Sequence, residues 1–330
     1  MARLKKHNLR RKDGVWDPLA DSASDKQRAS TVPQTPQSMS PAYRLAYADD
    51  DFLCREELRP VRLQLELLKV EMMLAERGIT STIVMFGGAR IPAPGADAWA
   101  ARNDTQRANL EAASVYYEEA RKFARLCSAR SAELGYKEYV VVTGGGPGVM
   151  EAGNRGAAEV GAPSIGLNIV LPHEQAPNEY VTPELSFNFH YFAVRKMHFL
   201  LRAKAVTVFP GGFGTLDELF ETMTLMQTGR MALVPLILFG KEFWKSIINF
   251  EALADFGTIA PADVELMQFV ETAEEAWDII VRFYEKLETE QAAAAQSVRG
   301  IKKRPGARLR GEHLQPTLQV ISCARADRPW

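Results

Sequence analysis

Two glycine-rich turns constrain the fold of this chain more than any other sequence feature. They lie at residues 143–151 (TGGGPGVME) and 210–218 (PGGFGTLDE), and each follows an apolar, β-branched run and opens a helical pattern. Glycine lets the backbone adopt positive φ and pass close to a ligand, while the free N–H groups and positive dipole of a helix start attract phosphate. The sequence therefore predicts a phosphate-binding site built from two strand-to-helix turns.

Strand-like and helix-like segments alternate through the middle of the chain. The predicted strands are the apolar runs at 82–86, 139–142, 164–171, 205–209 and 234–239. Helical patterns follow them, the last at 272–287. Such alternation indicates a parallel sheet covered by helices on both faces, with right-handed crossovers. We expect an α/β fold, a Rossmann-like doubly wound parallel sheet in a single domain with disordered tails.

Two long helical patterns flank the first predicted strand. Residues 55–78 combine apolar positions with interleaved charges and end at a glycine, and residues 103–134 form the second pattern. One face of the second pattern holds Tyr116, Ala120, Phe123 and Cys127. Both helices are candidates for a subunit interface, although an apolar helical face is more often ordinary core.

Composition divides the chain into four segments. Residues 1–50 are rich in Arg, Lys, Ser, Gln and Pro and cannot bury enough apolar surface to offset their ordering entropy, so a disordered basic arm is expected. A helical extension at 51–80 and the Rossmann-like domain at 81–290 follow. Residues 291–330 begin with an alanine run, become basic and show no clear period, so they are expected to form a disordered tail.

Charge and cysteine usage narrow the class of protein. The formal net charge of the 330 residues is -1, so we expect neither a nucleic-acid nor a membrane partner. The three cysteines are widely spaced, which argues against a disulfide framework and a zinc site and favours a cytoplasmic location. No run approaches the roughly 20 apolar residues of a membrane helix, and the basic first residues do not lead into an apolar segment.

The endings of the two turns favour a mononucleotide as the ligand. The first turn lacks the Gly-Lys-Ser/Thr ending of a P-loop, and neither turn gives Gly-x-Gly-x-x-Gly followed by an acidic residue about 20 positions later. Alternatively, Gly144 to Gly148 form only a tight turn with Pro147 at the first helical position. Three consecutive glycines, however, exceed what a turn requires.

Glu218 and the pair Arg195-Lys196 are the candidate chemical groups. Glu218 lies one helical turn inside the helix that follows the second turn, where its carboxylate could stand beside a bound phosphate. Two structural interpretations compete with this one. Thr215 and Glu218 match the spacing of a capping box, and a lone Arg-Lys pair is usually solvated on a helix face.

Together these residues resemble the Lonely Guy (LOG) family, once labelled lysine decarboxylases. Residues 210–218 are similar to its Pro-Gly-Gly-x-Gly-Thr-x-x-Glu signature, residues 144–150 to its first glycine turn, and Arg195-Lys196 to its Arg-Lys pair. The resemblance covers about residues 80–285. It implies a Rossmann-like fold and a homodimer or higher homo-oligomer. It also implies hydrolysis of the N-glycosidic bond of AMP, or of its N6-modified cytokinin forms, to free base and ribose 5-phosphate.

The resemblance assigns roles to particular residues. Glu218 and Arg195 are expected to be catalytic. The expected substrate-binding residues are Gly145, Gly146, Lys196, Gly211, Gly212, Gly214 and Thr215. No metal or organic cofactor is required. The base-side pocket is expected to differ from the family's, because Phe192-Ala193-Val194 replaces its Met-His-x.

Two other functions remain open. One is a non-catalytic nucleotide-binding or cofactor-carrier protein of the same fold. The presence of both Glu218 and Arg195 argues against it, since a protein that only binds a nucleotide needs no carboxylate near the phosphate. The other is a nucleic-acid or partner role for the basic tails, with the core sensing nucleotides. A pyridoxal-phosphate decarboxylase is disfavoured, because no lysine stands out as a Schiff base.

Overall fold

The computed structural model of the chain describes residues 21–172 and 176–302. The chain divides into two compact units, Met1–Leu65 and Glu66–Trp330. The first unit contains α1 (Ser22–Ala29), α2 (Asp50–Leu53) and three 3₁₀ turns, η1 (Pro41–Tyr43), η2 (Ala46–Ala48) and η3 (Glu56–Leu58). Helix α3 (Arg59–Glu76) runs from the first unit into the second.

Helix α1 lies inside the segment expected to be disordered. Its formation has a local cause, because the Asp21 side chain accepts a hydrogen bond from the Ser24 N–H and caps the helix start. Neither α1 nor α2 buries any of its residues. Local hydrogen bonds rather than a core therefore account for the ordered structure of this segment, and residues 1–20 lie outside the described residues.

The described part of the second unit forms one sheet of parallel strands in the order β4-β3-β2-β1-β5-β6-β7. The strands are β1 (Thr82–Phe86), β2 (Val140–Thr143), β3 (Ser164–Ile169), β4 (Ser186–Phe189), β5 (Ala203–Val208), β6 (Leu236–Phe239) and β7 (Met267–Val270). The chain moves outward from β1 to β4 and returns to β5 on the other side of β1. The doubly wound parallel sheet predicted from the sequence is confirmed.

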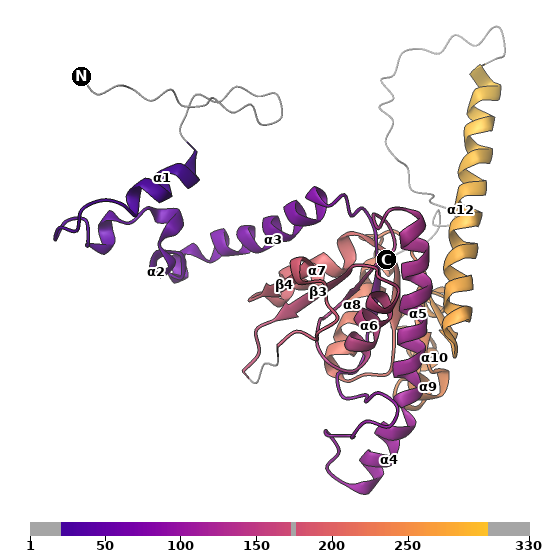
Figure 1. The fold of residues 1–330 in the computed structure, drawn as a ribbon. Coiled ribbons are helices and arrows are strands. Elements are labelled where there is room, and N and C mark those ends of the chain that lie inside the picture. Colours follow the sequence, from indigo (N-terminus) through magenta and orange to yellow (C-terminus); the bar gives the residue numbers. More distant parts are fainter. Residues whose placement is uncertain (1–20, 173–175, 303–330) are drawn as a thin grey trace. The chain divides into compact units, whose positions relative to one another are not determined.

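The helices of this unit connect the strands. They are α4 (Asp104–Ala112), α5 (Ser114–Glu133), α6 (Val149–Glu159), α7 (Phe192–Leu201), α8 (Phe213–Gln227), α9 (Lys241–Ile247), α10 (Phe250–Asp255), α11 (Pro261–Val264) and α12 (Ala273–Lys302), with the 3₁₀ turn η4 (Pro183–Leu185). Helix α5 packs against α6 and α12 (Figure 1). Among the described helices, none combines the length and apolar character that crossing a membrane requires.

Several elements differ from the sequence expectations. The helix predicted at 103–134 is interrupted at Ala113, so it forms α4 and α5. Helix α12 continues to Lys302, past the predicted start of the tail at residue 291, because its alanine run favours helix. Strands β4 and β7 were not predicted, since both are short and lie at the two edges of the sheet with some residues less buried.

The core forms around the central strand β1. All five residues of β1 are buried, as expected for a parallel strand covered on both faces. Ala120, Phe123 and Cys127 of α5 are fully buried, which confirms the apolar face predicted for that helix. Phe209 and Phe239 stack with their ring centroids 4.1 Å apart.

Gly156 sets the distance between α5 and α6. A Cβ atom at this position would lie 2.2 Å from the Arg121 carbonyl oxygen and 2.9 Å from the Ala124 Cβ. The backbone of α5 therefore occupies the space that any larger side chain on α6 would need. This contact holds α6, the helix that begins at the first glycine turn, close to the core.

We expect Gly156→Ala to destabilise the protein by about 2–3 kcal/mol, because the added methyl group forces the two helices apart. Urea denaturation followed by circular dichroism measures this change. Ala158→Ser, at an exposed position of the same helix, is the matched control and should shift the stability by no more than about 0.5 kcal/mol. A similarly small effect of Gly156→Ala would show that α5 and α6 can separate at little cost.

Candidate functional site

Three glycine turns meet at the carboxyl ends of β1, β2 and β5. The Gly88 N–H donates a hydrogen bond to the Pro210 carbonyl oxygen at 2.9 Å, and the Val149 N–H donates to the Gly88 carbonyl oxygen at 3.3 Å. The two turns found by sequence are thus joined through a third, at Gly87-Gly88 after β1, whose part in the site was not predicted. Strand order reverses between β1 and β5, where ligands bind in doubly wound sheets.

Close packing accounts for several of these glycines. A Cβ at Gly87 would lie 2.5 Å from the Val149 Cγ1, and one at Gly148, whose φ is +70°, would lie 2.4 Å from the Gly88 carbonyl oxygen. A Cβ at Gly211 would lie 2.2 Å from the hydroxyl oxygen of Thr215. The purely structural interpretation of the first turn is therefore correct for Gly148, because the turns interlock there.

Gly212 and Gly214 differ from the other glycines. No described atom would lie within 4 Å of a Cβ at either position, and neither residue has a positive φ. Gly214 also lies in the first turn of α8, where glycine is less favourable than alanine. Packing thus gives no reason for these two glycines, and the backbone at the start of α8 is open to a ligand.

The first glycine turn is held by polar side chains that sequence analysis missed. Asn178 donates from Nδ2 to the carbonyl oxygens of Gly145 and Gly146 at 3.1 and 3.0 Å. The Thr143 hydroxyl accepts a hydrogen bond from the Gly145 N–H at 3.0 Å and donates to Asn154 Oδ1 at 2.7 Å. Asn178 lies more than 30 residues from the turn, so no local pattern marks it. These bonds fix the shape of the turn before any ligand binds.

Arg195 of α7 and Glu218 of α8 form a buried ion pair beside the turns. Arg195 Nη1 lies 3.6 Å from Glu218 Oε1, and the two side chains are only 11% and 14% exposed. Arg195 Nε donates to the Leu167 carbonyl oxygen at 2.7 Å, and the guanidinium lies 5.1 Å from the centre of the Phe199 ring. The expectation of a solvated arginine on a helix face is therefore wrong, because tertiary contacts cover it.

Arg195 also contacts the first glycine turn. A Cβ at Gly144 would lie 2.6 Å from Arg195 Nη2, so only glycine leaves room for the guanidinium at this point. Arg195 consequently touches the first turn with one nitrogen and faces the carboxylate of the second turn's helix with another. The structure brings both predicted catalytic residues together with both glycine turns.

Burial changes the protonation behaviour of this pair. Loss of solvent raises the pKa of Glu218 to about 7, and the nearby Arg195 charge opposes that rise only in part. Burial likewise lowers the pKa of Arg195, against the attraction of Glu218. A carboxyl group that titrates near neutral pH can exchange a proton with a substrate or hold a charge under physiological conditions.

The capping-box interpretation of Glu218 is wrong. Helix α8 begins at Phe213 with Gly212 as its preceding residue, and no described side chain caps it. Thr215 therefore lies inside the helix and is itself buried, rather than occupying the position before it. The Glu218 carboxylate instead faces Arg195.

Lys196 is paired with two carboxylates of α8. Its Nζ lies 3.0 Å from both Asp217 Oδ2 and Glu221 Oε2, so it joins α7 to α8 through two ion pairs. Its side chain is only 17% exposed. Of the predicted substrate-binding residues, Lys196 is therefore paired with carboxylates of the protein itself. The others lie in the two glycine turns: Gly145, Gly146, Gly211, Gly212, Gly214 and Thr215.

These features define a Rossmann-like α/β protein. Its glycine turns interlock where the strand order reverses, between β1 and β5. Residues 150–280 match the family model described as "Possible lysine decarboxylase". The matched segment contains Arg195, the second glycine turn and Glu218, and it begins directly after the first turn's glycines. This match to a lysine-decarboxylase-like, or Lonely Guy, family model confirms the resemblance found in the sequence.

Solved structures give weaker likenesses. The molybdenum cofactor binding protein of Rippkaea orientalis is 18% identical, with 62% of this chain and 98% of that chain covered and a TM-score of 0.40. The molybdenum cofactor carrier protein of Chlamydomonas reinhardtii is 17% identical, with 62% and 99% covered and a TM-score of 0.39. Scores this low support no argument about function. No curated protein matches the chain.

We expect the contribution of Glu218 to stability to fall as pH rises from 4.5 to about 7, because Glu218 ionises more readily in the unfolded chain than in the folded one. Glu218→Gln removes this contribution, so its stability relative to the wild type should rise across the same window by up to about 3 kcal/mol. Urea denaturation at several pH values measures this difference. The exposed Glu251→Gln is the control, and an equal pH response in both variants would contradict the burial of Glu218.

Proposed function

We propose that this protein hydrolyses the N-glycosidic bond of a nucleoside 5′-monophosphate, AMP or an N6-modified AMP. The observation that carries the proposal is the buried Glu218–Arg195 pair between two glycine turns at the switch point of the sheet. The match of residues 150–280 to the lysine-decarboxylase-like family model supports it at the level of the family. The particular activity follows from what such a site can do chemically.

The start of α8 is the proposed 5′-phosphate site. Helix α8 has 15 residues, and its first backbone N–H groups have no partners within the helix. The open backbone at Gly212 and Gly214 allows a phosphate to approach these donors, and the helix dipole favours the negative charge. In this proposal Gly211 and Thr215 hold the shape of the turn, and Gly145 and Gly146 form the facing wall.

Cleavage breaks the bond between C1′ of the ribose and a nitrogen of the base. The bonding electrons leave with the base, and positive charge develops on the sugar as in glycoside hydrolysis. A water molecule then adds its oxygen to C1′, one of its protons is released, and the departing base is protonated. The products are the free base and ribose 5-phosphate.

Glu218 and Arg195 have distinct proposed roles. The Glu218 carboxylate stabilises the charge on the sugar or orients the attacking water through the ribose hydroxyls. Arg195 fixes the nucleotide or assists the departing base, and its contacts with Leu167 and Phe199 hold the guanidinium in place. A carboxyl group with a pKa of about 7 is poised between the charged and neutral forms that these steps use.

The carrier alternative explains this site less well. A protein that only binds phosphate gains nothing from a buried carboxylate next to it, because the two negative charges repel and burial of the carboxylate is itself costly. Wild-type protein that binds AMP tightly without releasing base from any nucleoside monophosphate would establish the carrier function instead.

Glu218→Gln should lower the rate of base release from AMP by at least about 10³-fold, because the amide cannot stabilise positive charge. Chromatography of the free base measures the rate, and isothermal calorimetry should still detect nucleotide binding. Glu221→Gln, one turn further along α8 and paired with Lys196, is the matched control and should retain activity.

Arg195→Ala tests the other half of the pair in the same assay. It should also lower turnover severely, since it leaves the Glu218 carboxylate buried without its partner. Unchanged kinetics in either variant would remove that residue from the mechanism. Circular dichroism of both variants separates loss of activity from loss of fold.

We also propose that the chain acts as a homodimer, as the family resemblance implies. Several apolar side chains on α7 and α8 are exposed, among them Phe192, Met197, Leu201 and Phe220. Exposed apolar side chains on neighbouring helices favour contact with a second copy. Sedimentation equilibrium should give a mass near twice the 36.7 kDa of one chain, and a monomer at micromolar concentration would contradict the proposal.

A further inference from the structure

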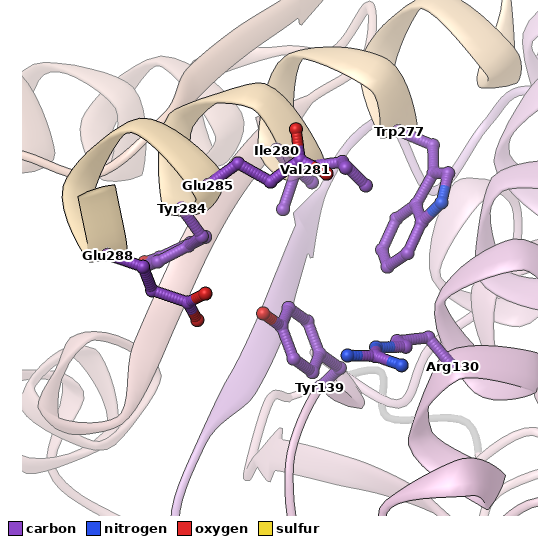
Figure 2. A pocket seen from close by; sticks show the side chains of 8 residues that line it. All are labelled: Arg130, Tyr139, Trp277, Ile280, Val281, Tyr284, Glu285 and Glu288. Carbon is purple, nitrogen blue, oxygen red and sulfur yellow. The ribbon is translucent and has the colours of Figure 1, made fainter.

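A hollow lies at the amino ends of the strands, opposite the glycine turns, which follow the carboxyl ends. It has a volume of about 410 Å³ and lies between α12 and Tyr139, the residue directly before β2 (Figure 2). This volume lies in the range of small-molecule sites. The proposed nucleotide site accounts for none of the residues that line it.

Three aromatic rings form the walls of this hollow. The ring centroids of Tyr139 and Trp277 are 5.9 Å apart with planes at 70°, and those of Tyr139 and Tyr284 are 6.4 Å apart with planes at 88°. Figure 2 shows Trp277 and Tyr284 reaching from α12 toward Tyr139. Rings at these angles pack edge to face, and any π face that stays uncovered attracts an organic cation.

Two of these rings already hold a cation of the protein. Lys204 Nζ lies 4.4 Å from the centre of the Tyr139 ring and 5.2 Å from that of Tyr284. Its charge is paired with Glu138, and the Tyr284 hydroxyl donates to the Lys204 carbonyl oxygen at 2.7 Å. The tyrosine faces thus accept an ammonium group in this environment.

Tyr139 adopts a backbone conformation that is unfavourable for its type. Its φ is +56°, in the left-handed region that aromatic residues rarely occupy. Its N–H donates to the Ser81 hydroxyl at 3.1 Å, which helps to hold this conformation. Strained residues of this kind gather at functional sites, and here the strain places the ring against the hollow.

The charge on the lining is negative. Glu285 and Glu288 lie one helical turn apart on α12, and Figure 2 shows the Glu288 carboxylate directed toward Tyr139. Neither carboxylate forms an ion pair with any of the described residues. Arg130, the basic residue of the lining, is paired with Glu133 on its own helix. Two carboxylates therefore remain available to a ligand.

We propose that this hollow binds a small organic ammonium ion, held by the face of Trp277 and by the carboxylates of Glu285 and Glu288. A neutral aromatic ligand could stack on the same rings but would gain nothing from the two carboxylates. Recognition of positive charge therefore distinguishes the proposed ligand class. This inference does not depend on the proposed hydrolase activity.

Choline and its uncharged isostere 3,3-dimethylbutan-1-ol form the test pair, since they differ in charge but hardly in shape. Saturation-transfer NMR on the full-length protein gives a dissociation constant for each. Choline should bind about tenfold more tightly than the alcohol. Equal affinities, or no choline binding at millimolar concentrations, would overturn the proposal.

Two variants locate the site. The double variant Glu285→Gln with Glu288→Gln changes only exposed positions, and it should weaken choline binding several-fold while leaving the alcohol unchanged. Trp277→Leu should weaken choline binding as well, because leucine fills space without a π face. Glu290→Gln, exposed on the same helix outside the hollow, is the control. Choline binding unaffected by both test variants would place it elsewhere and reject this site.

Discussion

The interlocking of three glycine turns at the carboxyl ends of β1, β2 and β5 is the constraint on which the candidate site depends. Gly87 and Gly148 let the turns after β1 and β2 approach within van der Waals contact, and the hydrogen bond from Gly88 to Pro210 joins the turn after β5 to them. Parallel strands end at the same edge, and the order of strands reverses between β1 and β5. The starts of α6 and α8 therefore lie close together, so that one ligand can face both.

The buried pair of Arg195 and Glu218 is possible only within that arrangement. Removing two charged groups from water costs several kcal/mol per ion, and part of this cost is offset here by their mutual attraction, by the hydrogen bond to Leu167 and by the Phe199 ring. The desolvation cost that these contacts do not offset raises the pKa of Glu218. Buried charged groups that a fold does not need for its own stability are typical of functional sites.

Sequence analysis identified most of the fold and the main groups of the site. The strand runs and both glycine turns have strong local patterns, and β1 and the buried face of α5 were found from periodicity alone. Strands β4 and β7 were missed because a short edge strand has little pattern, and Asn178 was missed because its contacts cross more than 30 residues. Gly87-Gly88 was visible as a glycine pair after a strand, but its role depends on which other turn it contacts.

The sequence by itself determined the parallel α/β class, the two glycine turns suited to phosphate, and Arg195 and Glu218 as candidate groups. It could do so because the hydrophobic period, the placement of glycines and the spacing of motifs are local properties of the chain. Tertiary structure decided which competing interpretation of each residue holds. Arg195 is buried rather than solvated, Glu218 faces a guanidinium rather than a helix cap, and Lys196 is engaged by carboxylates. It also set Tyr139, Trp277 and Tyr284 around one hollow. Such outcomes depend on contacts between distant segments, and these contacts exist only once the sheet has formed.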